Sequence, residues 1–158
     1  MSAAPRIRYR LGHPQDALAI GKLARRVTRR WILPGQPTSA VVPWLTGMGA
    51  WAIRRKIIDG RRFHLACLED GRVVGVAAMR DDSHLFQFFV STRWHGCGIA
   101  RRLWQRTLRD AQQRAGTRHF TLNSSAMAVP VYRRFGFVPS GPLKAKETGL
   151  VVQPMQLD

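Results

Sequence analysis

The amino-terminal part of the chain passes from an alternating pattern to helical spacing. Over residues 7–11, apolar side chains alternate with arginines, as in a half-buried strand. Pro14 suits a helix start, and apolar residues then recur at helical spacing over 17–31. Gly and Pro at positions 35 and 37 end that pattern. Two more helices are predicted, over 38–45, where Thr38 or Ser39 caps the start, and over 50–58.

The middle of the chain has the short apolar runs of strands. Residues 63–68 and 73–79 are joined by Asp70-Gly71, and Asp-Gly is a strong hairpin signal. A second turn over 81–83 leads into a third run, residues 85–90. These three runs predict an antiparallel meander.

Helical spacing returns in the last third and alternates with strands. One apolar stripe over 99–115 predicts a long amphipathic helix, which Gly116 ends. Residues 120–122 then predict a strand, 126–135 a short helix ending at Gly136, and 151–155 a last strand. Strands in a run, followed by strands alternating with helices, indicate an α+β layer fold. Since no repeat, linker or shift in composition divides it, residues 1–158 are predicted to form a single domain.

Composition narrows the class of protein. Hydrophobic residues make up 45% of the chain, too many for a disordered one, yet no run of 18 apolar residues predicts a membrane span. The charged first ten residues do not resemble a signal peptide. Two cysteines, Cys67 and Cys97, provide no disulfide framework, and a reducing, cytoplasmic location fits them best.

The charge is unusual at +17, from 26 Lys and Arg against nine Asp and Glu. Such a field attracts nucleic acid, acidic proteins and phosphorylated cofactors. However, 22 of the 26 are arginine, and they show no long basic run. Arginine usage also follows genome composition, so the charge biases the choice of partner without identifying it.

A glycine-containing turn between a predicted strand and the long helix carries the first chemical signal. In Trp94-His95-Gly96-Cys97-Gly98-Ile99 the glycines allow unusual backbone angles and close approach of a ligand. Free N–H groups and the dipole at the helix start favour an anion such as pyrophosphate. The alternative is an ordinary strand-to-helix turn. The segment lacks the Gly-Lys-Ser/Thr ending of a Walker loop, and it follows hairpins, unlike a Rossmann fingerprint.

A second segment, Ala128-Val129-Pro130-Val131-Tyr132 followed by Gly136-Phe137, extends the signal. Together the two segments resemble the GNAT superfamily of acyl-CoA-dependent N-acetyltransferases. Its signature is Gln/Arg-x-x-Gly-x-Gly/Ala after the fourth strand and Ala-x-x-x-Tyr-x-x-x-Gly-Phe near the end. The resemblance implies a mixed, mainly antiparallel sheet of about seven strands with about four helices, splayed between the fourth and fifth strands.

The resemblance also implies an acetyl-CoA site, with acetyl-CoA as co-substrate. Gly98 and Ala100 occupy the Gly-x-Gly/Ala positions, and His95 departs from the usual Gln or Arg. Main-chain groups of Phe88 to Val90 would pair with the pantetheine arm. The implied cofactor-binding residues are Phe88, Phe89, Val90, His95, Gly96, Cys97, Gly98, Ile99, Ala100, Arg101 and Asn123.

Tyr132 is the implied catalytic acid, since this tyrosine commonly protonates the departing CoA thiolate in the superfamily. A packing tyrosine is the alternative. The reaction implied is direct attack of a primary amine on the thioester in a ternary complex, with a main-chain N–H near Val90 stabilising the oxyanion. The general base is unassigned: His84 titrates in the right range, Gln87 cannot accept a proton, and Glu69, Asp81 and Asp82 are the nearby carboxylates.

Several points stay open. Cys97 lies opposite no His–acid pair, which argues against a covalent route, and the His and Cys spacing predicts no metal site. Trp31, Trp44 and Trp51 are candidates for the acceptor groove. The acceptor is a small-molecule or protein amine, and a homodimer is conceivable. The alternatives are a basic nucleic-acid- or ribosome-binding protein without catalysis, and a GNAT enzyme with an RNA-linked or ribosomal acceptor.

Overall fold

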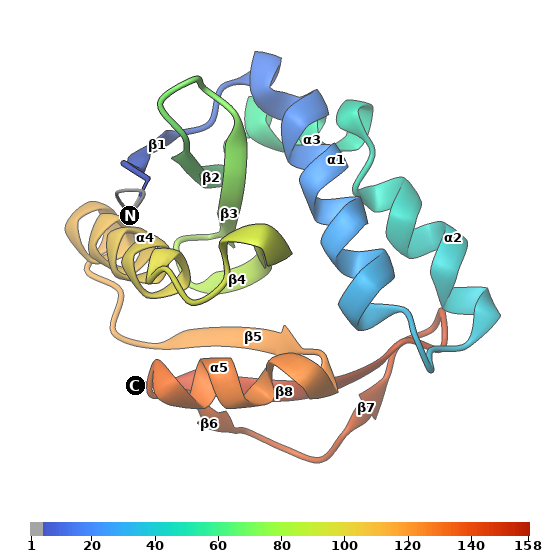
Figure 1. Ribbon diagram of the computed structural model, residues 1–158. Coiled ribbons are helices and arrows are strands. Elements are labelled where there is room, and N and C mark those ends of the chain that lie inside the picture. Colours follow the sequence, from blue (N-terminus) through green and yellow to red (C-terminus); the bar gives the residue numbers. More distant parts are fainter. Residues whose placement is uncertain (1–4) are drawn as a thin grey trace.

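The computed structural model describes residues 5–158, and its strands form one twisted sheet (Figure 1). The strand order is β1-β2-β3-β4-β5-β8-β6, with β7 pairing with β8 off this path. Among the strands of residues 5–158, only β4 and β5 pair in parallel. The strands are β1 (Arg8–Leu11), β2 (Arg62–Cys67), β3 (Val73–Arg80), β4 (His84–Val90), β5 (Phe120–Ser124), β6 (Val138–Pro139), β7 (Lys144–Ala145) and β8 (Val151–Leu157). The predicted mixed, mainly antiparallel sheet is confirmed.

Helices cover both faces of this sheet, as the α+β prediction requires. They are α1 (Ala17–Val27), α2 (Thr38–Gly47), α3 (Ala50–Ile58), α4 (Ile99–Ala115) and α5 (Val129–Arg134). Neighbouring residues of β3 face opposite cores: Val76 packs with α1 and α3, whereas Ala77 packs with α4 and α5. No helix in residues 5–158 is long and apolar enough to cross a membrane.

Two helical segments differ from the predicted spacing. The first helix does not run evenly to Trp31, because α1 gives way to a π-helical turn, η2 (Thr28–Ile32). The predicted helix over 126–135 is a 3-10 turn, η4 (Ala126–Ala128), followed by α5. A π turn shifts the following side chains around the helix axis, and such turns are frequent at functional sites.

Two short strands, β6 and β7, were not predicted individually. Each has two residues, too few to show an alternating pattern, and Pro139 lowers the strand signal of β6. Both are placed by pairing with β8, a tertiary contact that local sequence does not carry.

The sheet opens between β4 and β5, as the resemblance implied. The two strands pair at His84–Thr121 and Leu85–Leu122 and then diverge. The rest of β4, up to Val90, keeps β3 as its neighbour on one side only. In Figure 1 the α5–β5–β8 layer lies apart from the β1–β4 layer, and this split positions the site described next.

Candidate functional site

A cleft of about 540 Å³ opens where β4 and β5 diverge. Its walls come from η2, the end of β4, the start of α4, η4 and α5. Ten of the sequence-predicted residues line it: Phe88, Phe89, Val90, His95, Gly96, Gly98, Ile99, Ala100, Arg101 and Tyr132. Segments about 40 residues apart in sequence are therefore brought to one cavity, as a binding site for an extended ligand requires.

The turn into α4 has the backbone of an anion cradle. Gly96 and Gly98 have φ of +77° and +78°, and open space lies where a Cβ would stand at each. Gly98 is the N-cap of α4, so the N–H groups of the first turn have no partner within the helix. They form the positive end of the helix dipole, and Arg101 adds charge on the same helix, while Arg134 lines the cleft from α5. These features fit a pyrophosphate group.

Cys97 sits in this turn but does not line the cleft. Its side chain is exposed, and its thiol lies 3.8 Å from the carbonyl of His95. Cys67 is buried and also free. A reducing compartment stays a prediction, and no covalent role for Cys97 has structural support.

His95 lines the cleft, as the prediction of a cofactor-binding residue requires, and its side chain bonds to β4. Its Nε2 lies 2.9 Å from the carbonyl oxygen of Val90, so the ring donates a hydrogen bond to β4. The ring stacks on Trp31 with centroids 6.3 Å apart, and Trp31 Nε1 donates to Thr92 Oγ1 at 3.0 Å. A ligand that pairs with the Val90 carbonyl would share that oxygen with His95 or displace it.

Tyr132 is buried among aromatic rings beside the cleft. Its ring centroid lies 6.0 Å from that of Phe88 and 6.4 Å from that of Phe135. Burial raises the pKa of the phenol above its ordinary value, so the hydroxyl stays protonated at neutral pH. Within residues 5–158 the hydroxyl has no hydrogen-bond partner. It is therefore a free proton donor.

A smaller cavity of about 60 Å³, which we call the side pocket, adjoins the cleft and shares Tyr132 with it. Gln87 lies on its wall, is only 5% exposed, and its Oε1 has no hydrogen-bond partner. No carboxylate or cationic side chain lines it. Its lining residues are Ile32, Trp44, Leu85, Phe86, Gln87, Phe88, Phe89, Asn123, Ser125, Ala128, Tyr132, Leu150, Val151 and Val152.

The candidate bases lie outside both cavities. His84 is at the opposite end of β4 from Val90, six residues or ~20 Å along the strand. Its Nδ1 lies 2.7 Å from Thr121 Oγ1, and burial lowers its pKa. Glu69 is exposed in the β2–β3 turn, and Asp82 pairs with Arg114 at 3.4 Å. None of these groups lines the site.

The three tryptophans predicted as candidates for the acceptor groove lie in three different places. Trp31 lines the cleft and Trp44 lines the side pocket, whereas Trp51 on α3 is 78% exposed and lines neither. Asn123 lines the side pocket instead of the cleft. Sequence reasoning did not identify other residues of the cleft wall, because π-turn and loop geometry decide their direction: Ile32, Trp94, Ser125, Met127, Val131, Arg134 and Phe135.

Five basic side chains that are close in sequence also share one surface. One open depression is lined by Lys22, Arg25, Arg26, Arg29 and Arg30, all from α1 and η2. The same segment turns Val27 and Trp31 toward the cleft. Among residues 5–158 no group of three His, Cys, Asp or Glu side chains could hold a metal ion.

Comparison with known proteins agrees with this geometry. Residues 40–158 match the acetyltransferase (GNAT) domain family. None of the curated protein sequences matches the chain.

Solved structures with a similar fold span nearly the whole chain. A GCN5-related N-acetyltransferase from Rhodopseudomonas palustris aligns with a TM-score of 0.77 at 17% identity, covering 100% of this chain and 98% of that one. The PaiA N-acetyltransferase from Thermoplasma acidophilum, solved in complex with coenzyme A, gives 0.76 at 13% identity, with 97% and 99% covered. A chimera of the spermidine N-acetyltransferase from Vibrio cholerae gives 0.68 at 16% identity, with 96% and 94% covered. Because these sequence identities are low, the comparisons show a similar fold and not a shared substrate.

Proposed function

Because the chain belongs to the GNAT acetyltransferase family, we propose that it transfers an acetyl group from acetyl-CoA to a primary amine by direct attack in a ternary complex. When bound, acetyl-CoA supplies the activated thioester. The observation that carries the proposal is the pair of left-handed glycines, Gly96 and Gly98, opening a cleft whose other wall holds the free hydroxyl of Tyr132. This arrangement offers an anion cradle and a proton donor in one cavity.

Each wall of the cleft has a separate task. The amides from Gly96 to Arg101 would hold the pyrophosphate, and the free edge of β4 would align the pantetheine arm. The amine nitrogen bonds to the acetyl carbon, the carbon–sulfur bond breaks, and the sulfur leaves with the electron pair. Tyr132 would donate its proton to that sulfur, and a main-chain N–H near Val90 would stabilise charge on the acetyl oxygen. The proton that the amine nitrogen loses would pass through water to the Tyr132 oxygen and restore the phenol.

We assign the side pocket to the reacting end of the acceptor. Its ~60 Å³ holds about two waters' worth of volume, so only the amine-bearing tip of a molecule enters. Apolar surroundings disfavour an ammonium ion and lower the pKa of a bound amine. The unpartnered Gln87 Oε1 would accept an N–H from that neutral amine. The chain would then need no carboxylate base.

The same features constrain the acceptor. A polyamine needs carboxylates for its additional charges, and neither cavity has one. A net charge of +17 also repels polycations. The preferred acceptor is therefore a primary amine on an apolar body without a second positive charge.

Binding of acetyl-CoA is the direct test of the function. We expect stoichiometric binding by calorimetry and a higher melting temperature, since a ligand that binds only the folded state stabilises it by mass action. At a hundred times the Kd the gain is ~2.7 kcal/mol. A folded protein whose melting temperature stays unchanged at millimolar acetyl-CoA would contradict the proposal.

Gln87→Leu tests the side pocket. The variant removes a buried oxygen without a partner, so the free energy of unfolding should stay the same or rise. It also removes the proposed bond to the amine, and KM for the amine should rise roughly 3- to 10-fold. The Kd for acetyl-CoA should not change. An unaltered KM for an apolar amine would assign Gln87 to packing alone.

A second candidate function follows from the basic depression on α1. Its five cationic side chains, on the segment that also carries Val27 and Trp31 of the cleft, would suit an acceptor amine attached to RNA or to a ribosomal partner. RNA binding that weakens steeply with salt, and that Arg26→Gln with Arg29→Gln reduces, would support it. RNA binding without any acetyl-CoA binding would instead indicate a non-catalytic nucleic-acid-binding protein. A homodimer also stays a prediction.

A further inference from the structure

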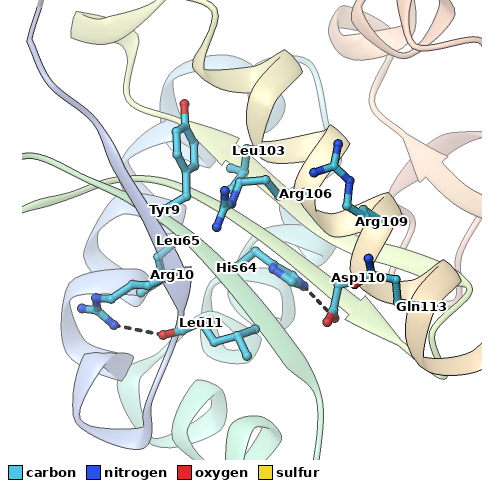
Figure 2. Close-up of a pocket in the computed structure, with 10 residues that line it drawn as sticks. All are labelled: Tyr9, Arg10, Leu11, His64, Leu65, Leu103, Arg106, Arg109, Asp110 and Gln113. Carbon is cyan, nitrogen blue, oxygen red and sulfur yellow. Dashed lines mark hydrogen bonds and ion pairs between the residues drawn. The ribbon is translucent and has the colours of Figure 1, made fainter.

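A separate cavity of about 250 Å³ lies between β1, β2 and α4 (Figure 2). We call it the β1–α4 cavity. The residues that line it include Tyr9 on β1, His64 on β2, and Arg106, Arg109, Asp110 and Gln113 on α4. None of these residues lines the cleft or the side pocket, so the cavity is distinct from the proposed transfer site.

Two guanidinium groups give this cavity uncompensated positive charge. In the described part of the chain, Arg106 and Arg109 pair with no carboxylate. Arg106 reaches from α4 toward β1, where its guanidinium lies 5.4 Å from the centre of the Tyr9 ring (Figure 2). The neighbouring Arg10 differs, because Asp16 binds it at 2.8 and 2.9 Å. Two free guanidinium groups at one cavity favour a carboxylate or phosphate ligand.

Asp110, the carboxylate that lines the cavity, does not neutralise Arg106 and Arg109. Asp110 accepts two hydrogen bonds from Arg62, at 2.7 and 3.0 Å. This bidentate pair neutralises Asp110 and fixes its orientation. Arg106 and Arg109 therefore keep their charge for a ligand.

His64 lies on the floor of the cavity and already has a partner there. It is only 8% exposed, and its Nε2 lies 3.2 Å from Asp110 Oδ2. In Figure 2 the ring points across the cavity floor toward Asp110. Because His64 lines the same cavity as Arg106 and Arg109, its ring can report binding of an anion there.

We propose that the β1–α4 cavity binds a small organic anion whose carboxylate or phosphate group lies between Arg106 and Arg109. The Tyr9 ring forms a flat wall for its body. The volume suits a small molecule more than a nucleic-acid chain. This proposal does not depend on acetyl transfer.

The test follows the His64 ring by NMR in the full-length protein while inorganic phosphate or citrate is added at constant ionic strength. We expect saturable shifts of the His64 signals for at least one anion. Arg106→Gln with Arg109→Gln should weaken that binding at least tenfold. The matched control, Arg118→Gln with Arg133→Gln, removes the same charge from exposed positions that line none of the described cavities and should leave the affinity unchanged.

Three results would overturn the proposal. The His64 signals could stay unchanged with both anions, or the two double variants could bind equally. Shifts caused by an RNA oligonucleotide alone would assign the arginines to a polyanion surface. Because the readout is the His64 ring, binding at the cradle of α4 would not imitate a positive result.

Discussion

Replacing Gly98 with Asp is expected to weaken acetyl-CoA binding at least about 100-fold. The new carboxylate would stand at the N-cap of α4, in the open space where a pyrophosphate is proposed to lie. Two unit charges 4 Å apart interact by about 4 kcal/mol at an effective dielectric of 20, and solvent screening reduces this. The change would also oppose the helix dipole's attraction for the phosphates. Calorimetry with acetyl-CoA measures the loss.

Two control variants separate charge from backbone strain. Gly98→Asn has nearly the same shape, tolerates the left-handed conformation as Asp does, and adds no charge. We expect it to lose much less affinity. Gly116→Asp places the same residue at the other end of α4, where φ is +66° and a Cβ has open space. This variant should bind acetyl-CoA normally. Its free energy of unfolding should fall slightly, because a carboxylate at the C-terminal end of a helix is repelled by the helix dipole. Equal losses for Gly98→Asp and Gly98→Asn would show that strain, not the cradle's electrostatics, controls binding.

Elements with strong local signals could be predicted well from the sequence. The meander follows from Asp70-Gly71 and from the Asp81–Asp82 turn, where both residues have positive φ. The long helix ends at Gly116 as its sequence indicates, and α3 has the predicted bounds. In each case hydrophobic period and turn chemistry agree, so local sequence suffices.

The backbone conformation of the site could be predicted from the sequence, whereas the partners of its side chains could not. Glycine in a turn specifies backbone shape, so the left-handed turn before α4 could be predicted, while binding of a pyrophosphate there stays a prediction. The partner of a side chain depends on neighbours distant in sequence. The His95 ring bonds to nearby Val90 but stacks on Trp31, which comes from the π turn after α1. The sequence excludes Gln87 as a base, and its buried, unpartnered Oε1 is a consequence of α2 and β8 closing the side pocket around it.

Replacing Tyr132 with Phe should lower the rate of acetyl transfer by about 10²–10⁴-fold if chemistry limits turnover, which is the usual contribution of a general acid. The change keeps the ring and its packing against Phe88 and Phe135. It breaks no intramolecular hydrogen bond in the described residues, so the melting temperature should hardly change. The Kd for acetyl-CoA should also stay near that of the parent. Single-turnover kinetics at saturating acetyl-CoA, with an apolar primary amine, measure the chemical step directly.

The pH profile gives this assignment a second, independent readout. Burial raises the pKa of the Tyr132 phenol above its ordinary value of 10.0, so the acid form persists throughout the range below pH 10. The single-turnover rate of the parent should therefore show no alkaline decline there from loss of the phenol proton. The other tyrosine, Tyr9, offers a matched control, since Tyr9→Phe removes a hydroxyl outside the cleft and should leave the rate unchanged. If Tyr132→Phe matched Tyr9→Phe in single turnover, Tyr132 would be a packing residue and another group or water would protonate the leaving sulfur.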